Sequence, residues 1–236
     1  MSSDQEISAR DWGRMSPYRE PGYKSTQLRG PTRAPIVMPQ TLSETTGPAL
    51  GYAAVTQEDA DLTTNARRNG EPIGERIIVT GKVMDENGRG IANSLVEIWQ
   101  ANATGRYVHV NDKHDAPLDP NFLGAGKCVT DADGTYRFQT IRPGAYPWPN
   151  HHNAWRPPHI HFSLMGTSIL NRLVTQMYFP GDPLLAYDPI FNAIADEDAR
   201  QAMVAGFELD LTEPNWALGY RFDIVLRGRN ATPMEN

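Results

Sequence analysis

The amino-acid sequence predicts an all-β fold, namely an antiparallel β-sandwich with an extended proline-rich N-terminal arm and one short C-terminal helix. Three observations predict it. Short runs of β-branched and aromatic residues recur after residue 72, turn sequences of Asp, Asn and Gly separate them, and 19 prolines and 20 glycines are spread along the 236 residues. A chain of this length can form one sizeable domain with its own core.

Residues 1–72 form the predicted arm. This stretch is rich in Pro, Gly, Ser and Thr and has no sustained hydrophobic periodicity, so it lacks a core of its own. It still carries side chains that an arm can bury, namely Tyr18, Tyr23, Ile36, Val37 and Met38. We therefore expect residues 1–72 to pack on a partner chain and residues 73–236 to form the sandwich domain.

The expected strands after residue 72 are 77–83, 95–99, 127–130, 135–140, 160–164, 173–179 and 220–226. Residues 131–134 (DADG) are predicted as a plain hairpin turn. A calcium loop starting there would need Gly at its sixth position and Glu at its twelfth, where Tyr136 and Arg142 stand. Residues 196–207 are the predicted helix, because acidic residues in a first turn interact favourably with the helix dipole.

Composition excludes several classes of protein. The net charge is −6 and the isoelectric point is near 5.5, so neither nucleic acid nor an anionic membrane is an expected partner. No apolar run approaches the ~20 residues that span a bilayer, and the first residues lack the apolar stretch of a signal peptide. The single cysteine, Cys128, excludes an internal disulfide. A cytoplasmic location is expected.

A pair of histidines is the first candidate for chemistry. His159 and His161 lie two residues apart in a strand-like run that follows Arg156 and two prolines. On a strand this spacing directs both imidazoles to one face, while Ile160 and Phe162 point to the other. The prolines fix the start of the strand rigidly. Alone, the pair is compatible with metal ligands and with ordinary surface or core histidines.

The neighbouring sequence limits the kind of metal. No histidine follows His161 and residues 163–174 contain no carboxylate, which disfavours a zinc or cupin-type set. A two-histidine, one-carboxylate iron site requires an acidic residue beside a ligand histidine, and Ile160 occupies that position. The nearest hard anionic candidates are Tyr107 and Tyr146. Either tyrosine could equally be a half-buried aromatic residue with a solvated hydroxyl.

Four sequence blocks in order resemble the intradiol ring-cleaving dioxygenases: 95–102 (LVEIWQAN), 105–107 (GRY), 142–148 (RPGAYPW) and 155–162 (WRPPHIHF). Within that family the resemblance is greatest to the beta subunits of the protocatechuate-cleaving branch, and it covers nearly the whole chain. It implies a non-haem Fe(III) enzyme that uses O2 to cleave protocatechuate (3,4-dihydroxybenzoate) between its hydroxyls. The implied product is 3-carboxy-cis,cis-muconate, in the beta-ketoadipate pathway of aromatic catabolism.

The resemblance also implies the iron ligands. Tyr107, Tyr146, His159 and His161 would hold the metal, with hydroxide as a fifth ligand. Two phenolates and one hydroxide cancel the charge of Fe(III), so the buried site can be neutral overall. The bound cation also removes the phenolic protons. By analogy Tyr146 is the ligand that leaves, and takes up a proton, when the catechol binds.

Other roles follow from the same resemblance. Arg156 would stabilise developing negative charge, although a surface salt bridge is an alternative role. Trp148 and Ile190 would form walls of the pocket, and Gln176 would make a polar contact with the substrate. Tyr23 would extend from the arm towards the substrate carboxylate. The implied partner is an iron-free alpha subunit in a hetero-oligomer.

Two alternatives stay open. A catechol or hydroxyquinol intradiol dioxygenase would use the same iron, but such relatives carry a helical N-terminal dimerisation region, whereas residues 1–72 are Pro-rich. A non-catalytic β-sandwich module is the other, because residues 83–93 resemble the opening of carrier and adhesion-type domains. Such a module has no reason to hold two tyrosines and two histidines together.

Overall fold

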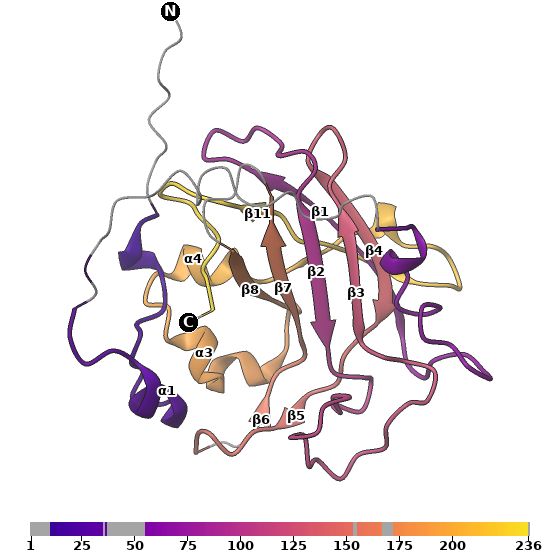
Figure 1. Cartoon of the computed structure of the whole chain (residues 1–236), viewed down its shortest axis with the longest axis horizontal. Helices are drawn as coiled ribbons and strands as arrows, with labels where there is room; N and C mark the ends of the chain where they lie inside the picture. Colours follow the sequence, from indigo (N-terminus) through magenta and orange to yellow (C-terminus); the bar gives the residue numbers. More distant parts are fainter. Residues whose placement is uncertain (1–9, 35, 37–54, 153–154, 167–171, 236) are drawn as a thin grey trace, which may run out of the picture.

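The computed structural model describes residues 10–34, 36, 55–152, 155–166 and 172–235 (Figure 1). One sheet has the strand order β11-β1-β10-β9, with β4 also paired to β1, and the other has the order β3-β2-β7-β8. The first sheet consists of β1 (Arg76–Met84), β4 (Thr135–Ile141), β9 (Gly206–Phe207), β10 (Leu218–Arg221) and β11 (Ile224–Val225). The second consists of β2 (Leu95–Gln100), β3 (Ala125–Val129), β7 (His159–Met165) and β8 (Leu173–Tyr178).

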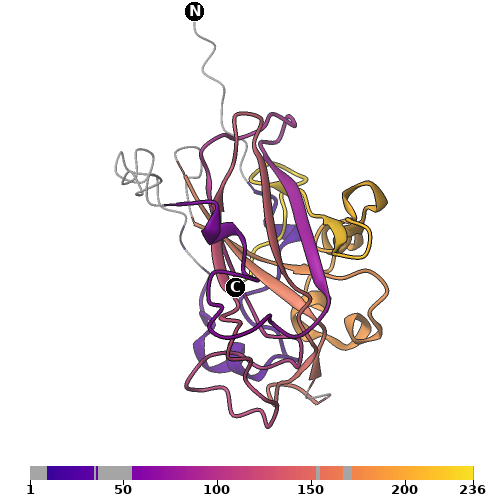
Figure 2. The same cartoon turned by 90° about the vertical axis from the view of Figure 1, so that its right-hand side faces the viewer.

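Short elements surround these sheets. A small antiparallel pair, β5 (Tyr146–Pro147) and β6 (Trp155–Arg156), stands apart from both sheets. The α-helices are α1 (Lys24–Arg29), α3 (Pro189–Asn192) and α4 (Glu197–Gln201), and the 3-10 helices are η1 (Trp12–Arg14), η3 (Glu58–Ala60), η4 (Pro183–Tyr187) and η5 (Leu209–Leu211). The segment with α3 and α4 projects from one side of the sheets (Figure 2). Within the described part of the chain, no helix has the length and apolar character that crossing a membrane requires.

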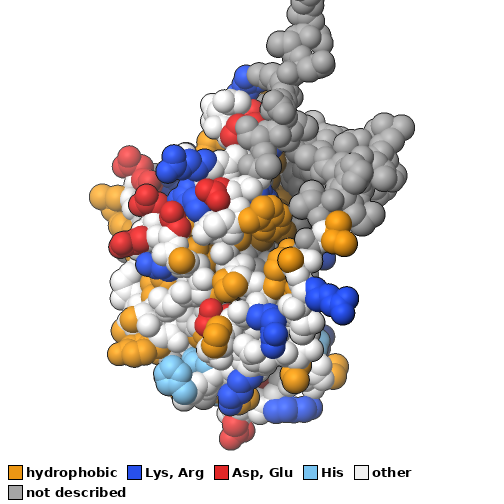
Figure 3. Space-filling model, turned by 90° about the vertical axis from the view of Figure 1, so that its left-hand side faces the viewer, with side chains coloured by type: hydrophobic (Ala, Val, Ile, Leu, Met, Phe, Trp, Pro, Cys, Tyr) orange, Lys and Arg blue, Asp and Glu red, His pale blue; other side chains and the backbone are white. Residues whose placement is uncertain are grey.

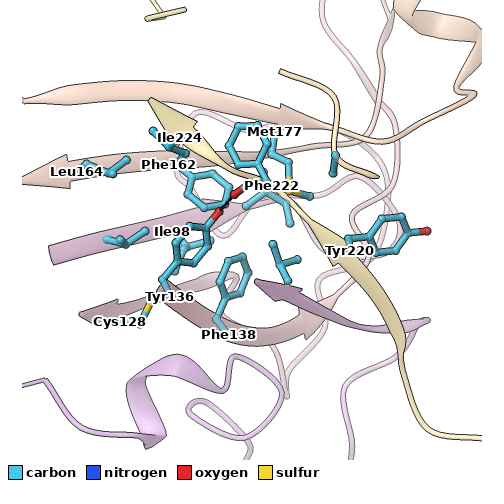
Figure 4. Close-up of a cluster of buried hydrophobic side chains, with 14 of the residues drawn as sticks. Ile98, Cys128, Tyr136, Phe138, Phe162, Leu164, Met177, Tyr220, Phe222 and Ile224 are labelled. Atoms are coloured by element: carbon cyan, nitrogen blue, oxygen red, sulfur yellow. Dashed lines mark hydrogen bonds between the residues drawn. The ribbon is translucent and has the colours of Figure 1, made fainter. Parts of the chain in front are cut away.

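Aromatic side chains from both sheets meet in the main core (Figure 4). The Phe162 ring of β7 lies 5.8 Å from Phe138 of β4 and 5.2 Å from Phe222, which follows β10. Burying one such side chain stabilises the fold by roughly 1.5–3 kcal/mol. Because alternate residues of β7 point into this core, the histidines between them must face away from it.

The β-sandwich prediction is confirmed, with one difference in strand direction: β10 and β11 run parallel to β1, so the first sheet is mixed. The single strand expected at 220–226 is two strands, interrupted where Phe222 passes Gly81. A side chain on Gly81 would overlap the Phe222 carbonyl. There the backbone N–H of Lys82 donates to the Asp223 side chain, at 2.8 Å, instead of to a strand partner.

The 131–134 segment is a turn, as predicted, but it does not close a hairpin. It joins β3 of one sheet to β4 of the other. Asp131 organises the turn, because its Oδ1 accepts hydrogen bonds from the backbone N–H of Asp133 at 2.9 Å and of Thr135 at 2.8 Å. Gly134 takes a φ of +80°, which suits glycine. Local turn chemistry therefore does not reveal which sheet the next strand joins.

The helix predicted over 196–207 is shorter than expected, and it is not the only one. Glu197 and Asp198 stand in the first turn of α4 as predicted, and Asp196 caps it by accepting from the Ala199 N–H at 2.8 Å, but the helix ends at Gln201. The backbone beyond it pairs with β8: Tyr178 donates to the Met203 carbonyl at 2.8 Å. These pairings stop the helix, and Phe207 lies in β9. The helices α1 and α3 were not predicted.

Residues 10–29 lie along the side of the molecule that carries α3, α4 and the closing segment (Figure 1). Arg14 forms an ion pair with Asp196 at 3.1 Å, and Arg10 Nη1 donates to the Thr232 carbonyl at 3.0 Å. Charged side chains of both signs are interspersed with hydrophobic ones on this face (Figure 3). The described start of the arm therefore contacts this chain's own domain.

Residues 55–72, also assigned to the arm, pack with the sandwich. Leu62 is completely buried in the main core, and its backbone N–H donates to the Gln139 carbonyl of β4 at 2.9 Å. Val37 and Met38 lie outside the described residues. Contact of residues 1–72 with a partner chain stays a prediction.

Candidate active site

Two adjacent strands position the histidine pair. His159 and His161 lie on one face of β7, with ring centroids 4.8 Å apart, while Phe162 points into the core. The register with β8 places Tyr178 opposite His159 and Gln176 opposite His161. The face that the spacing of two predicted is therefore lined by polar side chains from two strands.

The small β5–β6 pair brings the second sequence block to these histidines. Its register places Tyr146 directly opposite Arg156. The Tyr146 ring lies 5.5 Å from His159 and 5.4 Å from Tyr107, measured between centroids. Proline-rich sequence around both strands limits them to two residues each, and this short pairing is what positions Tyr146 at the end of β7.

Tyr107 arrives from a tight turn at the end of β2. The Asn102 side chain holds this turn, because its Oδ1 accepts from the Arg106 N–H at 2.9 Å. Gly105 has a φ of +78°, and a side chain there would overlap the Ala145 carbonyl. This close approach of the two loops brings Tyr107 beside the tyrosine of β5.

Arg156 is buried at the centre of a polar network. Its Nε donates to Asp188 Oδ1 at 3.1 Å and its Nη2 to Asp188 Oδ2 at 2.8 Å. Nη2 also donates to Gln176 Oε1 at 2.7 Å and to the Tyr178 hydroxyl at 3.0 Å. With only 2% of Arg156 exposed, the surface salt bridge considered as its alternative role is wrong; the salt bridge is a buried one.

The remaining nitrogen of Arg156 faces the candidate ligands. Nη1 donates to the Tyr146 hydroxyl at 3.3 Å and lies 3.1 Å from His159 Nε2. The guanidinium carbon is 5.3 Å from the centre of the Trp148 ring. Burial disfavours the charged guanidinium, but the Asp188 carboxylate outweighs this and raises the pKa of Arg156. Arg156 therefore supplies a fixed positive charge at the site.

Each histidine has its Nδ1 occupied. His159 Nδ1 is 2.8 Å from the Pro157 carbonyl and His161 Nδ1 is 3.1 Å from Glu235 Oε2. A carbonyl and a carboxylate can only accept, so each Nδ1 carries the proton and each Nε2 presents a lone pair. Burial raises the pKa of Glu235, but the interactions with His161, Gln176 and Arg156 together outweigh it and lower that pKa to about 2. This is the arrangement that metal-binding histidines adopt.

The donor set fits a hard trivalent cation. Burial raises the pKa of Tyr107 well above its ordinary value, and burial also raises that of Tyr146, partly offset by Arg156. Burial together with Arg156 holds the pKa of His159 well below its usual range. The Tyr107 hydroxyl is buried and makes no hydrogen bond within the described residues. A cation would complete this group by ionising the phenols and binding the Nε2 lone pairs, that of His159 in place of its contact with Arg156 Nη1.

Carboxylates and thiols do not provide an alternative site. Among the described residues, no three His, Cys, Asp or Glu side chains gather closely enough to hold a metal ion. Among the described residues, Tyr107 and Tyr146 are therefore the candidates to accompany the histidine pair in a metal site.

A cavity of about 880 Å³ is lined by three of the four candidate ligands, all except His159. Tyr107, Tyr146, His161 and Trp148 are among its lining residues. It is large enough for a single aromatic ring. The wall role expected for Trp148 therefore agrees with its position.

The other expected substrate contacts do not line the cavity. Tyr23 reaches Trp148, with ring centroids 4.7 Å apart, and its hydroxyl accepts from Arg29 Nη2 at 2.6 Å. Gln176 is completely buried behind Arg156, and its Nε2 makes no hydrogen bond in the described part of the chain. Ile190 is buried on α3.

The sequence analysis did not identify three residues of this network. Asp188 precedes a proline and has the local pattern of a helix cap, so nothing marks it as the partner of Arg156. Tyr178 lies in an ordinary strand run. Glu235 is 74 residues from His161. The Trp99 ring stacks on His161, with centroids 4.7 Å apart. Unlike those three residues, Trp99 lies in the 95–102 block that resembles the family, and this block was the available signal for it.

Comparison with known proteins identifies the family. A family model described as "Dioxygenase" matches residues 45–228, and one described as "Protocatechuate 3,4-dioxygenase beta subunit N terminal" matches residues 8–41. The solved 3-chlorocatechol 1,2-dioxygenase of Rhodococcus opacus 1CP superposes with a TM-score of 0.56, at 23% identity, over 80% of this chain and 71% of that one. This likeness concerns the fold alone.

The chain belongs to the intradiol dioxygenase family, whose members use non-haem iron. Within it, the chain is 60% identical over 235 residues, the full length of both proteins, to the protocatechuate 3,4-dioxygenase beta chain of Burkholderia cepacia. It is 30% identical over 204 residues to the alpha chain of Pseudomonas putida, covering 83% of this chain and 96% of that one. The non-catalytic sandwich module is therefore the wrong alternative.

Proposed function

We propose that this chain cleaves protocatechuate between its two hydroxyls with O2 at a ferric centre held by Tyr107, Tyr146, His159 and His161. The observation that carries the proposal is the group of two half-buried tyrosines and two buried histidines beside a cavity large enough for one ring. The 60% identity to a protocatechuate 3,4-dioxygenase beta chain favours protocatechuate over catechol or hydroxyquinol.

Iron held by these residues would supply Lewis-acid chemistry to the bound catechol. The chain's own residues then have separate tasks. Tyr146, which Arg156 already contacts at 3.3 Å, would, once ionised, take up one of the two catechol protons at its phenolate oxygen. The histidines would stay in place, because their Nδ1 atoms are held by Pro157 and Glu235.

Arg156 would stabilise the negative charge that develops as oxygen adds to the ring. Its guanidinium is fixed by Asp188 before the reaction starts, so little reorganisation is needed. Trp148 would form the wall against which the ring lies, since it lines the cavity. Tyr23 with Arg29 lies behind Trp148 and offers a hydroxyl and a cation towards the substrate carboxylate. Gln176 would act through Arg156, and Ile190 through the position of α3.

The same proposal includes a partner. The relatives named as beta and alpha chains of one enzyme support an assembly of this chain with an iron-free alpha subunit. Such a partner would cover the open side of the cavity. The cytoplasmic location expected from the sequence stays a prediction.

Oxygen uptake tests the proposed substrate. Protein co-expressed with an alpha chain is supplied with protocatechuate, catechol or hydroxyquinol at equal concentrations, and both O2 consumption and product are measured. The proposal expects fastest uptake with protocatechuate and 3-carboxy-cis,cis-muconate as the product. Faster turnover of catechol, or a product opened outside the two hydroxyls, would overturn it.

A further inference from the structure

The carboxylate of Glu235 lies against the outer nitrogen of His161. The Nδ1–Oε2 distance is 3.1 Å, and the side chains of His161 and Glu235 are 11% and 24% exposed. This contact joins a histidine in the middle of a core strand to a residue far along the chain. It is shielded from water on most sides, so it competes little with solvent.

The closing segment delivers Glu235 to this position by regular hydrogen bonds. The Glu235 N–H donates to the Val174 carbonyl of β8 at 2.8 Å, and Thr175 Oγ1 donates to the Pro233 carbonyl at 2.7 Å. In β8, Val174 stands two residues before the position opposite His161. The backbone pairing therefore sets where the carboxylate lies.

The two histidines of the site are held by acceptors of different charge. His159 donates to a neutral backbone carbonyl, that of Pro157, whereas His161 donates to a carboxylate. A carboxylate fixes the proton on Nδ1 more strongly and makes the opposite nitrogen a better electron donor. The Trp99 ring, stacked on the imidazole at 4.7 Å and 5° between planes, limits tilting of the ring.

We propose that Glu235 is a positioning residue for the metal site: it fixes the proton of His161 on Nδ1 and thereby keeps the Nε2 lone pair directed at the site. The inference rests on the proposed function for its metal, because Glu235 acts on the iron only through His161. Its direct consequence, the state of the His161 ring, exists without any metal.

The first experiment measures that ring in the metal-free full chain. Histidine labelled with 15N reports which ring nitrogen carries the proton. We expect Nδ1–H for His161 in the natural protein and in Glu235→Gln, because the amide oxygen still accepts. In Glu235→Ala we expect a mixture of both forms. A natural protein with the proton on Nε2, or an unchanged ring in Glu235→Ala, would overturn the proposal whether or not iron binds.

The second experiment measures loss of Fe(III) to a chelator from the loaded protein. Glu235→Ala should lose iron about 10- to 100-fold faster, and Glu235→Gln should lie between it and the natural protein. The control is Thr175→Val, which removes the hydrogen bond to Pro233 and leaves the carboxylate. Equal iron loss in Thr175→Val and Glu235→Ala would assign the effect to packing of the segment and reject the proposal. If no variant, nor the natural protein, binds iron, the proposed function fails while the ring measurement still decides the role of Glu235.

Discussion

Arg156 and Asp188 form a bidentate ion pair that is buried away from water. Both carboxylate oxygens of Asp188 accept from the guanidinium, at 3.1 and 2.8 Å, and the side chains are 2% and 0% exposed. Arg156 stands on β6 and Asp188 just before α3, so the pair links two parts of the chain around the site. Each partner is acceptable in the interior only because the other is present.

Replacing Asp188 by Asn should therefore destabilise the protein strongly. The buried guanidinium would lose its counter-charge, and removing one partner of such a pair costs about 3–5 kcal/mol. Urea unfolding measures the change in the free energy of unfolding. The control is Glu213→Gln. Glu213 and its ion-pair partner Arg137 are both about half exposed, so the expected loss in the free energy of unfolding is at most about 1 kcal/mol. Similar losses in both variants would show that burial of the pair does not matter.

Arg156→Lys should separate catalysis from iron binding. Lysine keeps the positive charge but cannot reproduce the forked contacts to Asp188, so the charge near Tyr146 would be misplaced. We expect iron content to be retained while kcat falls about 10²-fold. The variant is preferable to Arg156→Ala, which would leave Asp188 unpaired. Arg137→Lys serves as the control, and an unchanged kcat in iron-replete Arg156→Lys would restrict Arg156 to a structural role.

Gly81→Ala tests the close approach in the mixed sheet. The added methyl group would overlap the Phe222 carbonyl, and relief requires β1 or the segment between β10 and β11 to move. We expect a loss of about 1–3 kcal/mol in the free energy of unfolding. Gly206→Ala, where nothing lies within 4 Å of the added atom, is the matched control. A Gly81 variant as stable as the Gly206 variant would contradict the described packing.

The dependence on a partner is tested by expression with and without an alpha chain. Expressed alone, the chain should be poorly soluble, or bind iron and turn over protocatechuate weakly, because the cavity opens to one side. Co-expression should restore activity. A stable monomer with full activity towards protocatechuate would mean that the pocket is completed within one chain.

Much of this architecture could be predicted from local sequence. Local residue patterns predict the strands around Ile98 and Phe162, the histidine spacing and the short block around Tyr146. The folded chain has these local structures. The parallel placement of β10 and β11, the change of sheet after Asp131, and the contacts of Asp188 depend on packing between distant segments. Such contacts leave no local signal, which is why the sequence indicated candidate ligands but not the residues that contact them.

Visible absorption of the iron-loaded protein tests the central claim most directly. Phenolate bound to Fe(III) gives a charge-transfer band, so the natural protein should be red-brown and Tyr107→Phe should shift and weaken the band. Tyr136→Phe is the control, because Tyr136 is buried in the core and donates to the Phe222 carbonyl there; the band of this variant should be unchanged. A colourless natural protein with full activity, or a Tyr107→Phe variant with the natural spectrum, would contradict the account.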